Sequence, residues 1–318
     1  TRMVPSPPMF LLTHVRKRSS FFLLALLTGF LPPLGTVTEA RDRIPIVVTI
    51  PVLKDLAEQV GGPHVRVTSL LSGYENEHTY SPKPTDLIAV RKARLLLEIG
   101  MGLEVWVSSL VKNAGGQSLR VITTSHGVEL IHDDTDAHEG TPHDGKAGNP
   151  HVWLDPENVT IMLRHITDAL IEVDPSHTTE FRTNQAAYLQ RLGQVQQELS
   201  ARIQRLSDRR FIAHHPAWPY LAKRFSLDIV GTIHMQSGTE PSALHLQALI
   251  QKMRRDNIKV IVSEIQLSQR LPELLARETK AHVVVLTTMP GGLEGTATYL
   301  DMLRYNVLQL AGALETTS

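Results

Sequence analysis

The longest helical pattern in the chain runs over residues 176–206, directly after the helix-stopping pair Asp174-Pro175. Apart from Gly193 it contains no glycine or proline. A helix of about 30 residues is about 45 Å long, which exceeds the length of an ordinary crossover between neighbouring strands. This segment therefore predicts a rigid helix that joins two separate lobes.

Short apolar segments alternate with amphipathic helical segments on both sides of this long helix. Strands are expected at 44–50, 65–71, 94–99 and 119–124, and then at 210–214, 228–233, 259–264 and 282–287. Helices are expected at 51–60, 85–93, 103–114, 156–173, 217–225, 241–255, 269–280 and 296–314. Apolar strands between amphipathic helices predict parallel sheets covered on both faces. The expected fold is α/β, with two Rossmann-like lobes that each contain a four-stranded parallel sheet, and with the ligand site in the cleft between them.

The N-terminus has the order of regions found in a secretory signal peptide. The basic cluster 16–18 precedes the apolar segment 21–31, and small residues follow up to Ala40. The apolar segment is too short to span a bilayer comfortably, and a buried N-terminal helix is the alternative. The expected domains are a signal peptide at 1–40, an N-terminal lobe at 41–175, the linking helix at 176–206 and a C-terminal lobe at 207–318.

Cysteine is absent from all 318 residues. The exported protein therefore cannot form disulfides or carry a lipid on an N-terminal cysteine, so we expect it free in a periplasm. Any metal site must use nitrogen and oxygen ligands. After residue 40 the chain has 28 basic and 31 acidic side chains, which is not the charge of a nucleic-acid-binding protein.

The chain contains 15 histidines, and several follow expected strands. His78 lies after the second strand, His151 follows the long loop after the fourth, and His214 and His215 end the fifth. Glu264 ends the seventh strand. Ligands of open α/β sheets bind beyond the carboxyl ends of the strands, and imidazoles from separate loops suit a tetrahedral Zn²⁺ ion. A single histidine at such a place is more often a hydrogen-bonded loop residue, so spacing alone leaves both interpretations open.

Five stretches carry a resemblance to a known family: 77–87, 100–106, 149–156, 214–220 and 299–303. Together they resemble the metal-specific solute-binding proteins of ABC transporters, called cluster 9 or cluster A-I, whose members carry zinc or manganese. The resemblance extends over residues 43–314. It implies metal ligands at His78, His151 and His215, with His214 as a neighbour of the site.

The resemblance leaves the fourth ligand open. The family usually places an aspartate just after the last strand, where this chain has Thr287 and Thr288. Because a threonine hydroxyl is a poor ligand for Zn²⁺, the resemblance points instead to Glu77 or to a water molecule. Glu264 is another candidate, although a carboxylate at that place can equally support a ligand histidine.

A second group of histidines lies in the polar segment 125–148. It consists of His126, His132, His138 and His143, together with several acidic residues. The segment has no hydrophobic periodicity, so it is either a solvated loop or an auxiliary loop that gathers zinc. The second interpretation favours zinc over manganese, as do three imidazole ligands, because manganese prefers more oxygen ligands.

The resemblance predicts a protein that captures Zn²⁺ in the periplasm and delivers it to an ABC permease, whose cytoplasmic ATPase is an indirect partner. We expect a monomer and, as a further partner, a periplasmic metallochaperone. A manganese or iron carrier with the same fold is the first alternative. The second is a secreted zinc hydrolase with Glu77 or Glu264 as general base, but the chain has no His-Glu-x-x-His motif and we expect no enzyme.

Overall fold

The computed structural model describes residues 43–115, 118–132, 148–235 and 239–316. These residues belong to one compact unit, Asp42–Ser318. The predicted signal peptide and the centre of the histidine-rich segment, including His138 and His143, lie outside the described residues. The domain boundaries given above therefore remain a prediction.

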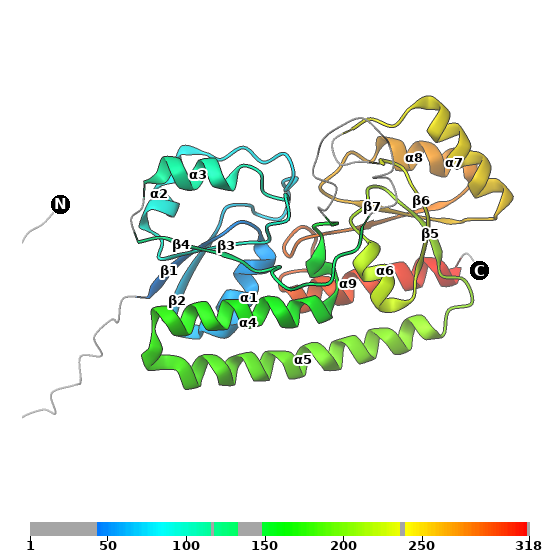
Figure 1. Ribbon diagram of the computed structural model, residues 1–318. Helices are drawn as coiled ribbons and strands as arrows, with labels where there is room; N and C mark the ends of the chain where they lie inside the picture. Colours follow the sequence, from blue (N-terminus) through cyan, green and yellow to red (C-terminus); the bar gives the residue numbers. More distant parts are fainter. Residues whose placement is uncertain (1–42, 116–117, 133–147, 236–238, 317–318) are drawn as a thin grey trace, which may run out of the picture. The chain divides into compact units, whose positions relative to one another are not determined.

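The first sheet has the strand order β2-β1-β3-β4, and all its strands are parallel. Its strands are β1 (Ile44–Val48), β2 (Val65–Ser69), β3 (Leu95–Glu98) and β4 (Arg120–Thr123). The helices that alternate with them are α1 (Pro51–Gly61), α2 (Pro84–Lys92) and α3 (Val107–Ala114), and α4 (Pro156–Val173) follows the last strand. Figure 1 shows α2 and α3 on one face of this sheet, with α1 and α4 on the other. Strand β1 is almost fully buried because both faces are covered.

The second sheet repeats this order as β6-β5-β7-β8, again with parallel strands. Its strands are β5 (Arg210–Ala213), β6 (Asp228–Thr232), β7 (Val260–Glu264) and β8 (His282–Leu286). The helices of this half are α6 (Pro219–Phe225), α7 (Ala243–Arg255), α8 (Arg270–Thr279) and α9 (Tyr299–Thr316). The two four-stranded parallel sheets confirm the predicted fold class.

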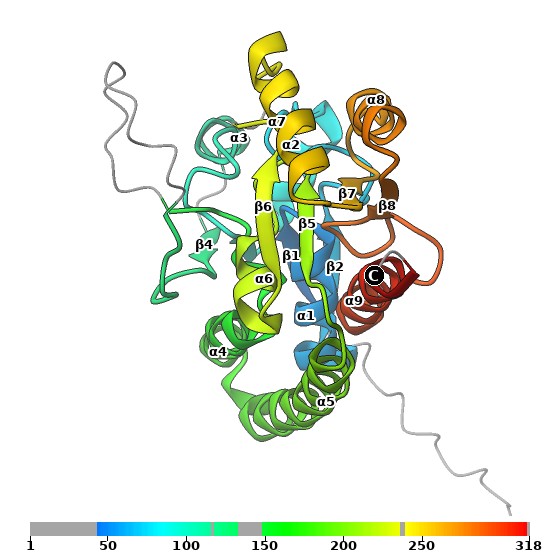
Figure 2. The ribbon, with the colours of Figure 1, turned by 90° about the vertical axis from the view of Figure 1, so that its right-hand side faces the viewer.

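Helix α5 (Thr178–Gln204) has 27 residues and runs alongside elements of both halves. It packs on α1 and α4 near its start and on α6 and α9 further along, as the two ribbon views agree (Figures 1 and 2). Its buried side chains recur at helical spacing: Phe181, Tyr188, Leu192, Val195, Leu199 and Ile203. The prediction of one long helix that joins two sheets is thus confirmed.

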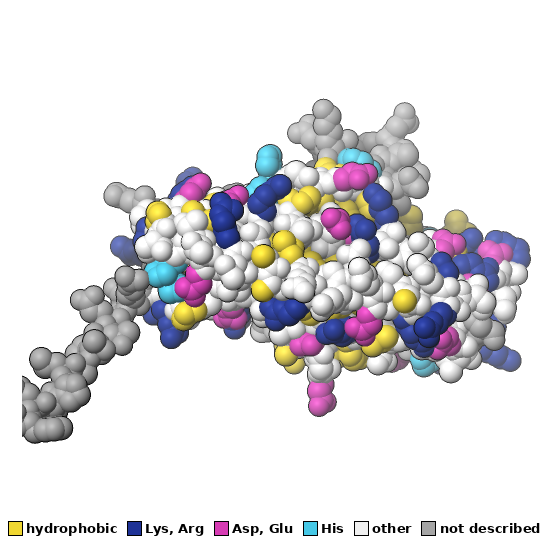
Figure 3. Space-filling view, turned by 90° about the horizontal axis from the view of Figure 1, so that it is seen from below, with side chains coloured by type: hydrophobic (Ala, Val, Ile, Leu, Met, Phe, Trp, Pro, Cys, Tyr) yellow, Lys and Arg dark blue, Asp and Glu magenta, His cyan; other side chains and the backbone are white. Residues whose placement is uncertain are grey.

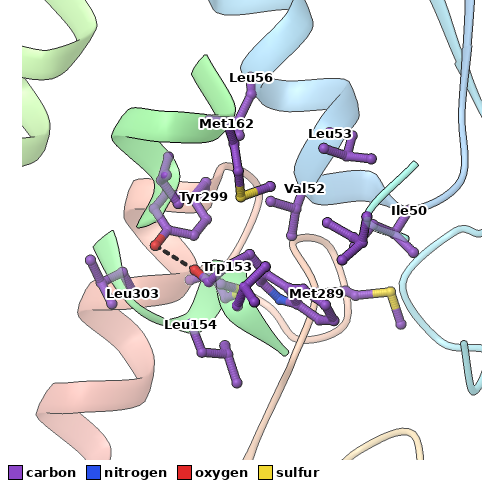
Figure 4. Packing of buried hydrophobic residues seen from close by; sticks show 14 of the residues in the cluster. Ile50, Val52, Leu53, Leu56, Trp153, Leu154, Met162, Met289, Tyr299 and Leu303 are labelled. Carbon is purple, nitrogen blue, oxygen red and sulfur yellow. Dashed lines mark hydrogen bonds between the residues drawn. The ribbon is translucent and has the colours of Figure 1, made fainter. Parts of the chain in front are cut away.

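A dense part of the core lies where α1, α4, α9 and the segment before α9 meet. The indole of Trp153 is fully buried beside Val52 and Met289 (Figure 4). Its Nε1 donates to the Thr288 carbonyl at 2.7 Å, and the Tyr299 hydroxyl donates to the Trp153 carbonyl at 2.8 Å. These bonds connect the segment before α4 to the C-terminal half, which fixes the main chain directly beside His151.

Several helices start later than predicted, and α3 shows the largest difference. The pattern indicated a start at Leu103, whereas α3 begins at Val107. The reason is Glu104, whose buried carboxylate accepts hydrogen bonds from the main-chain N–H groups of Ile99 and Gly100 and from the Thr49 hydroxyl. A turn around this carboxylate occupies residues 101–106, so the helix cannot begin before it.

Lysine, arginine, aspartate and glutamate are interspersed on the face of the molecule seen in Figure 3. Mixed charges of this kind give no extended positive surface on that face. In the described part of the chain, no helix combines the length and the apolar character that crossing a membrane requires.

Candidate metal centre

Corresponding places in the two sheets position the candidate metal centre. The strand order changes direction between β1 and β3 in the first sheet and between β5 and β7 in the second. Such switch points leave a crevice beyond the carboxyl ends of the strands. His215 follows β5 and Glu264 ends β7, so both lie at the second switch point. His78 comes from the loop after β2 and His151 from the turn before α4, and these side chains meet His215 from the other half.

The three histidines come together through one nitrogen each. The Nε2 atoms of His78 and His151 are 3.1 Å apart, and those of His151 and His215 are 3.4 Å apart. Two nitrogen ligands at about 2.05 Å on a tetrahedral zinc ion are about 3.3 Å apart. Among the described residues, these three form the one group whose ligand atoms all lie within 4.8 Å of one another. His151 and His215 are buried and His78 is partly buried, and we call this group the buried triad.

Asn149 orients the imidazole of His151. Its Oδ1 accepts a hydrogen bond from the His151 main-chain N–H at 3.0 Å and lies 3.0 Å from the ring Nδ1. A carbonyl oxygen only accepts, so Nδ1 carries the hydrogen and Nε2 carries the lone pair that a metal binds. The Asn149 amide also donates to the Pro216 carbonyl at 2.6 Å, which connects the His151 turn to the loop that carries His215. This role of Asn149 was not predicted from the sequence.

Glu264 supports His215 from the side of the ring that faces away from His78 and His151. Its Oε1 lies 3.1 Å from His215 Nδ1 and accepts a hydrogen bond from the Trp218 indole. The carboxylate is fully buried. It therefore favours the form of His215 with hydrogen on Nδ1 and leaves Nε2 directed at the triad. This geometry fits the second of the two roles considered for Glu264, that of a support.

Glu77 lies beside the triad. Its side chain is buried, and Oε1 lies 3.6 Å from His151 Nε2. No hydrogen-bond donor within the described residues reaches this oxygen. A buried carboxylate oxygen without a donor is costly, and a bound cation would remove that cost. The role of Glu77 as the fourth ligand stays a prediction.

Burial keeps His78 and His151 in the form that binds metals. It lowers the pKa of His78 from 6.5 to about 4, and the nearby imidazole of His151 adds to the effect. Burial also lowers the pKa of His151 well below its usual value, with His215 as the second cause. A neutral imidazole is the form that ligates a metal ion, so these two histidines need no deprotonation at neutral pH.

Other predicted residues lie outside the triad. His214 is buried, but its Nδ1 faces the Ser263 hydroxyl at 3.0 Å. The Thr287 hydroxyl, in the region of the family aspartate, donates to the Met289 carbonyl at 2.8 Å. His126 and His132, at the start of the histidine-rich segment, are exposed.

Two sheets joined by a long helix, with buried neutral imidazoles gathered between them, define a solute-binding protein that carries a metal ion. A family model described as the periplasmic component A of a zinc-uptake complex, ZnuA, matches residues 46–313, and the chain belongs to this family. It is therefore a metal-binding solute-binding protein of ABC importers and not an enzyme, and the hydrolase alternative is not favoured.

Similar proteins agree with this assignment. A putative metal-binding protein of Treponema pallidum is 29% identical over 84% of this chain and 85% of its own length. The high-affinity zinc uptake protein ZnuA of Bacillus subtilis is 26% identical over 92% of this chain and 94% of its own length. A crystal structure of ZnuA has a TM-score of 0.77 and 30% identity, and covers 86% of this chain and 100% of its own. Other relatives are named as iron-binding and manganese-binding proteins.

Proposed function

We propose that this protein captures Zn²⁺ in the periplasm and delivers it to the permease of an ABC importer. The ligands would be Nε2 of His78, His151 and His215, with a carboxylate oxygen of Glu77 as the fourth. The observation that carries this proposal is the spacing of the three Nε2 atoms, 3.1 and 3.4 Å along the triad, which matches tetrahedral zinc.

The choice of zinc over manganese rests on the ligand atoms. Three imidazole nitrogens and one carboxylate favour zinc, whereas manganese prefers sites richer in oxygen. Thr287 supports this choice, because its hydroxyl is bonded to the main chain of Met289 and adds no oxygen ligand. The names of the relatives include zinc, iron and manganese, so the names alone do not decide.

Several further features belong to the same proposal. Residues 1–40 would be a signal peptide that directs the chain to the periplasm, and the lobes 41–175 and 207–318 would move as units about the helix 176–206. The docking partner would be the permease, with the ATPase as indirect partner and a metallochaperone as a metal donor. The histidines of segment 126–148 would bind zinc weakly beside the main site.

Calorimetric titration of metal-stripped protein with Zn²⁺ and, separately, Mn²⁺ at pH 7.5 tests the proposal. We expect one tight zinc site and manganese binding weaker by about a hundredfold or more. Glu77→Gln should weaken zinc binding at least about tenfold, because one charged ligand is lost. Glu75→Gln, a change in the same loop whose carboxylate binds Ser72 instead, is the matched control.

The outcomes separate the alternatives. Manganese binding as tight as zinc binding would assign the manganese function of the family. Equal zinc affinity in both glutamate variants would remove Glu77 from the ligand set. The absence of any tight site for either metal would overturn the proposed function.

A further inference from the structure

Two ligands of the proposed centre, Glu77 and His78, lie in the segment 70–83, which connects β2 to α2 and which we call the ligand loop. Their partner His215 belongs to the second half of the molecule. The centre is therefore complete only while the ligand loop stays against that half. What holds the loop there determines how readily a bound ion can leave.

Gln266 holds the ligand loop from the second half. It follows β7, and its Nε2 donates to the Gly73 carbonyl of the loop at 2.7 Å and to the Thr287 hydroxyl oxygen at 2.9 Å. The Thr287 hydroxyl itself donates to the Met289 carbonyl, so its oxygen is free to accept from the amide. Both hydrogens of the Gln266 amide are thus used, and one of them joins the two halves of the molecule.

Two glycines make this contact possible. Gly73 has a φ of +107°, and a Cβ there would lie 2.6 Å from the Pro290 carbonyl oxygen. A Cβ on Gly292 would lie 2.9 Å from the Gly73 carbonyl oxygen and 3.1 Å from Gln266 Nε2. These distances are shorter than van der Waals contact, so only glycine lets the two main chains approach closely enough for the Gln266 bond.

The packing beside this contact is open. A cavity of about 180 Å³ is lined by Asn76 of the ligand loop together with Leu267 and other residues of the second half. By contrast, the turn that carries His151 is joined to the second half through Trp153, whose fully buried indole donates to a carbonyl there. Because a cavity provides no packing contacts, the ligand loop is attached to the second half less extensively than the His151 turn.

We propose that Gln266 is a positioning residue for metal retention: its hydrogen bond to Gly73 keeps the ligand loop against His215, and the ion leaves when this bond opens. Gln266 is not a ligand and acts only through the loop. Thr287, in the region of the family aspartate, contributes to this contact and not to the ligand set. The inference rests on the proposed function, which supplies the metal and its ligands.

The first test measures zinc release from the full chain. Each protein is loaded with one equivalent of Zn²⁺ and mixed with an excess of a chelating dye. Gln266→Met keeps the length of the side chain but removes the donor, and we expect zinc to leave it about three- to tenfold faster than the parent, as for the loss of a hydrogen bond. Gly292→Ala separates the same main chains from the other side and should act in the same direction.

Gln269→Met is the matched control. Gln269 Nε2 donates to the carbonyls of Glu264 and Leu267, which both belong to the second half, so this substitution leaves the attachment of the ligand loop in place. We expect zinc to leave this variant at the rate of the parent. Faster release from both glutamine variants would indicate a general loss of packing and would overturn the inference.

A second test follows the ligand loop without metal. The chain has no cysteine, so spin labels can be attached at Tyr74→Cys and Leu244→Cys, two exposed positions in different halves. We expect the distribution of distances between the labels to widen in the metal-stripped Gln266→Met protein and to stay unchanged in Gln269→Met. An unchanged distribution in Gln266→Met would overturn the inference.

The two tests separate this inference from the proposed function. Equal rates of zinc release from the parent and from Gln266→Met would overturn the inference and leave the proposed function intact. A parent protein that retains no zinc would contradict the proposed function itself. The label distances would then still decide whether Gln266 holds the ligand loop against the second half.

Discussion

Two groups of histidines in this protein both have rings in close contact but lie in opposite environments. The buried triad has ring centroids 5.1 Å apart at its two closest contacts. The second group, which we call the junction pair, consists of His64 and His177, whose stacked rings are 3.7 Å apart next to the start of α5. Proximity of rings is therefore not what distinguishes a metal centre.

The difference lies in what each nitrogen faces. In the junction pair, His64 Nε2 is 2.9 Å from Glu180 and His177 Nδ1 is 2.5 Å from Asp174. Each ring thus has a carboxylate of its own, as in an ordinary surface ion pair. In the triad the Nε2 atoms face one another, and the supporting groups, Asn149 and Glu264, occupy the Nδ1 side. A cation site forms where the lone pairs of several nitrogen atoms point at the same position.

The largest expected effect comes from removing a ligand of the triad. His151→Ala should weaken zinc binding by about a hundred- to a thousandfold, because about 10–16 kcal/mol of zinc affinity is shared among four ligands. Competition with a chelating dye at pH 7.5 measures the change. His177→Ala is the matched substitution in the junction pair and should leave zinc affinity unchanged. A comparable loss of zinc affinity in His177→Ala would show that the junction pair also contributes to metal binding.

An intermediate effect is expected from the support of His215. Glu264→Gln keeps the volume of the buried side chain and an acceptor for the Trp218 indole, but removes the negative charge beside two imidazoles. Groups that orient a ligand are typically worth 10–100-fold in metal affinity, and we expect a loss in that range. Glu180→Gln makes the same change beside His64 and should have no effect on zinc binding. Unchanged affinity in Glu264→Gln would mean that His215 needs no such support.

The sequence predicted the fold better than it predicted the surroundings of the site. Alternating apolar strands and amphipathic helices are local patterns, and a helix free of proline over residues 178–204 is visible without any structure. The histidines of the triad are separated by more than sixty residues. Their convergence depends on the parallel order of the strands, so they could be selected among 15 histidines only through the family resemblance.

The supporting groups were not predictable from the sequence. Asn149 lies two residues before His151, but nothing in that spacing says that its amide faces the ring Nδ1 and also binds Pro216. Which nitrogen of an imidazole is left open is a property of the tertiary structure, and only the folded chain shows it.

A smaller effect is expected from pH. Three exposed imidazoles with a pKa of about 6.5 would each be about nine-tenths protonated at pH 5.5 and together lose about 10³-fold in affinity relative to pH 7.5. Burial lowers the pKa of His78 to about 4 and that of His151 below its usual value, so protons compete with zinc only at lower pH. Because these two ligands stay neutral, we expect zinc affinity to fall by no more than about tenfold between pH 7.5 and 5.5, and to fall steeply below pH 5.

Zinc competition at several pH values measures this profile. A variant with His64→Ala and His177→Ala should have the same profile, because the junction pair does not take part in binding. A thousandfold loss at pH 5.5 would mean that the triad is solvated before the metal binds, which would contradict its observed burial.

The smallest effect is expected from the junction pair itself. Burial acts to raise the pKa of Asp174, but hydrogen bonds with Ser176 and His177 outweigh it and hold the pKa below its usual 3.8. A carboxyl whose pKa is depressed by folding stabilises the folded state above the pKa of the unfolded chain, and this contribution is lost as the pH falls through the lower, folded value. Asp174→Asn should therefore reduce the free energy of unfolding at pH 7 by no more than about 1 kcal/mol, as for other ion pairs near the surface.

Urea unfolding of the metal-stripped Asp174→Asn protein at pH 7 and pH 3 measures this contribution, and the difference from the parent should shrink at pH 3. Zinc affinity should stay within experimental error of the parent value, because Asp174 is bonded to groups at the start of α5 and to none in the triad. A loss of zinc affinity in this variant would show that the junction at α5 and the metal centre are coupled. The junction pair would then help to set the relative position of the two sheets. The two histidine groups would differ in their distance from the metal and not in their function.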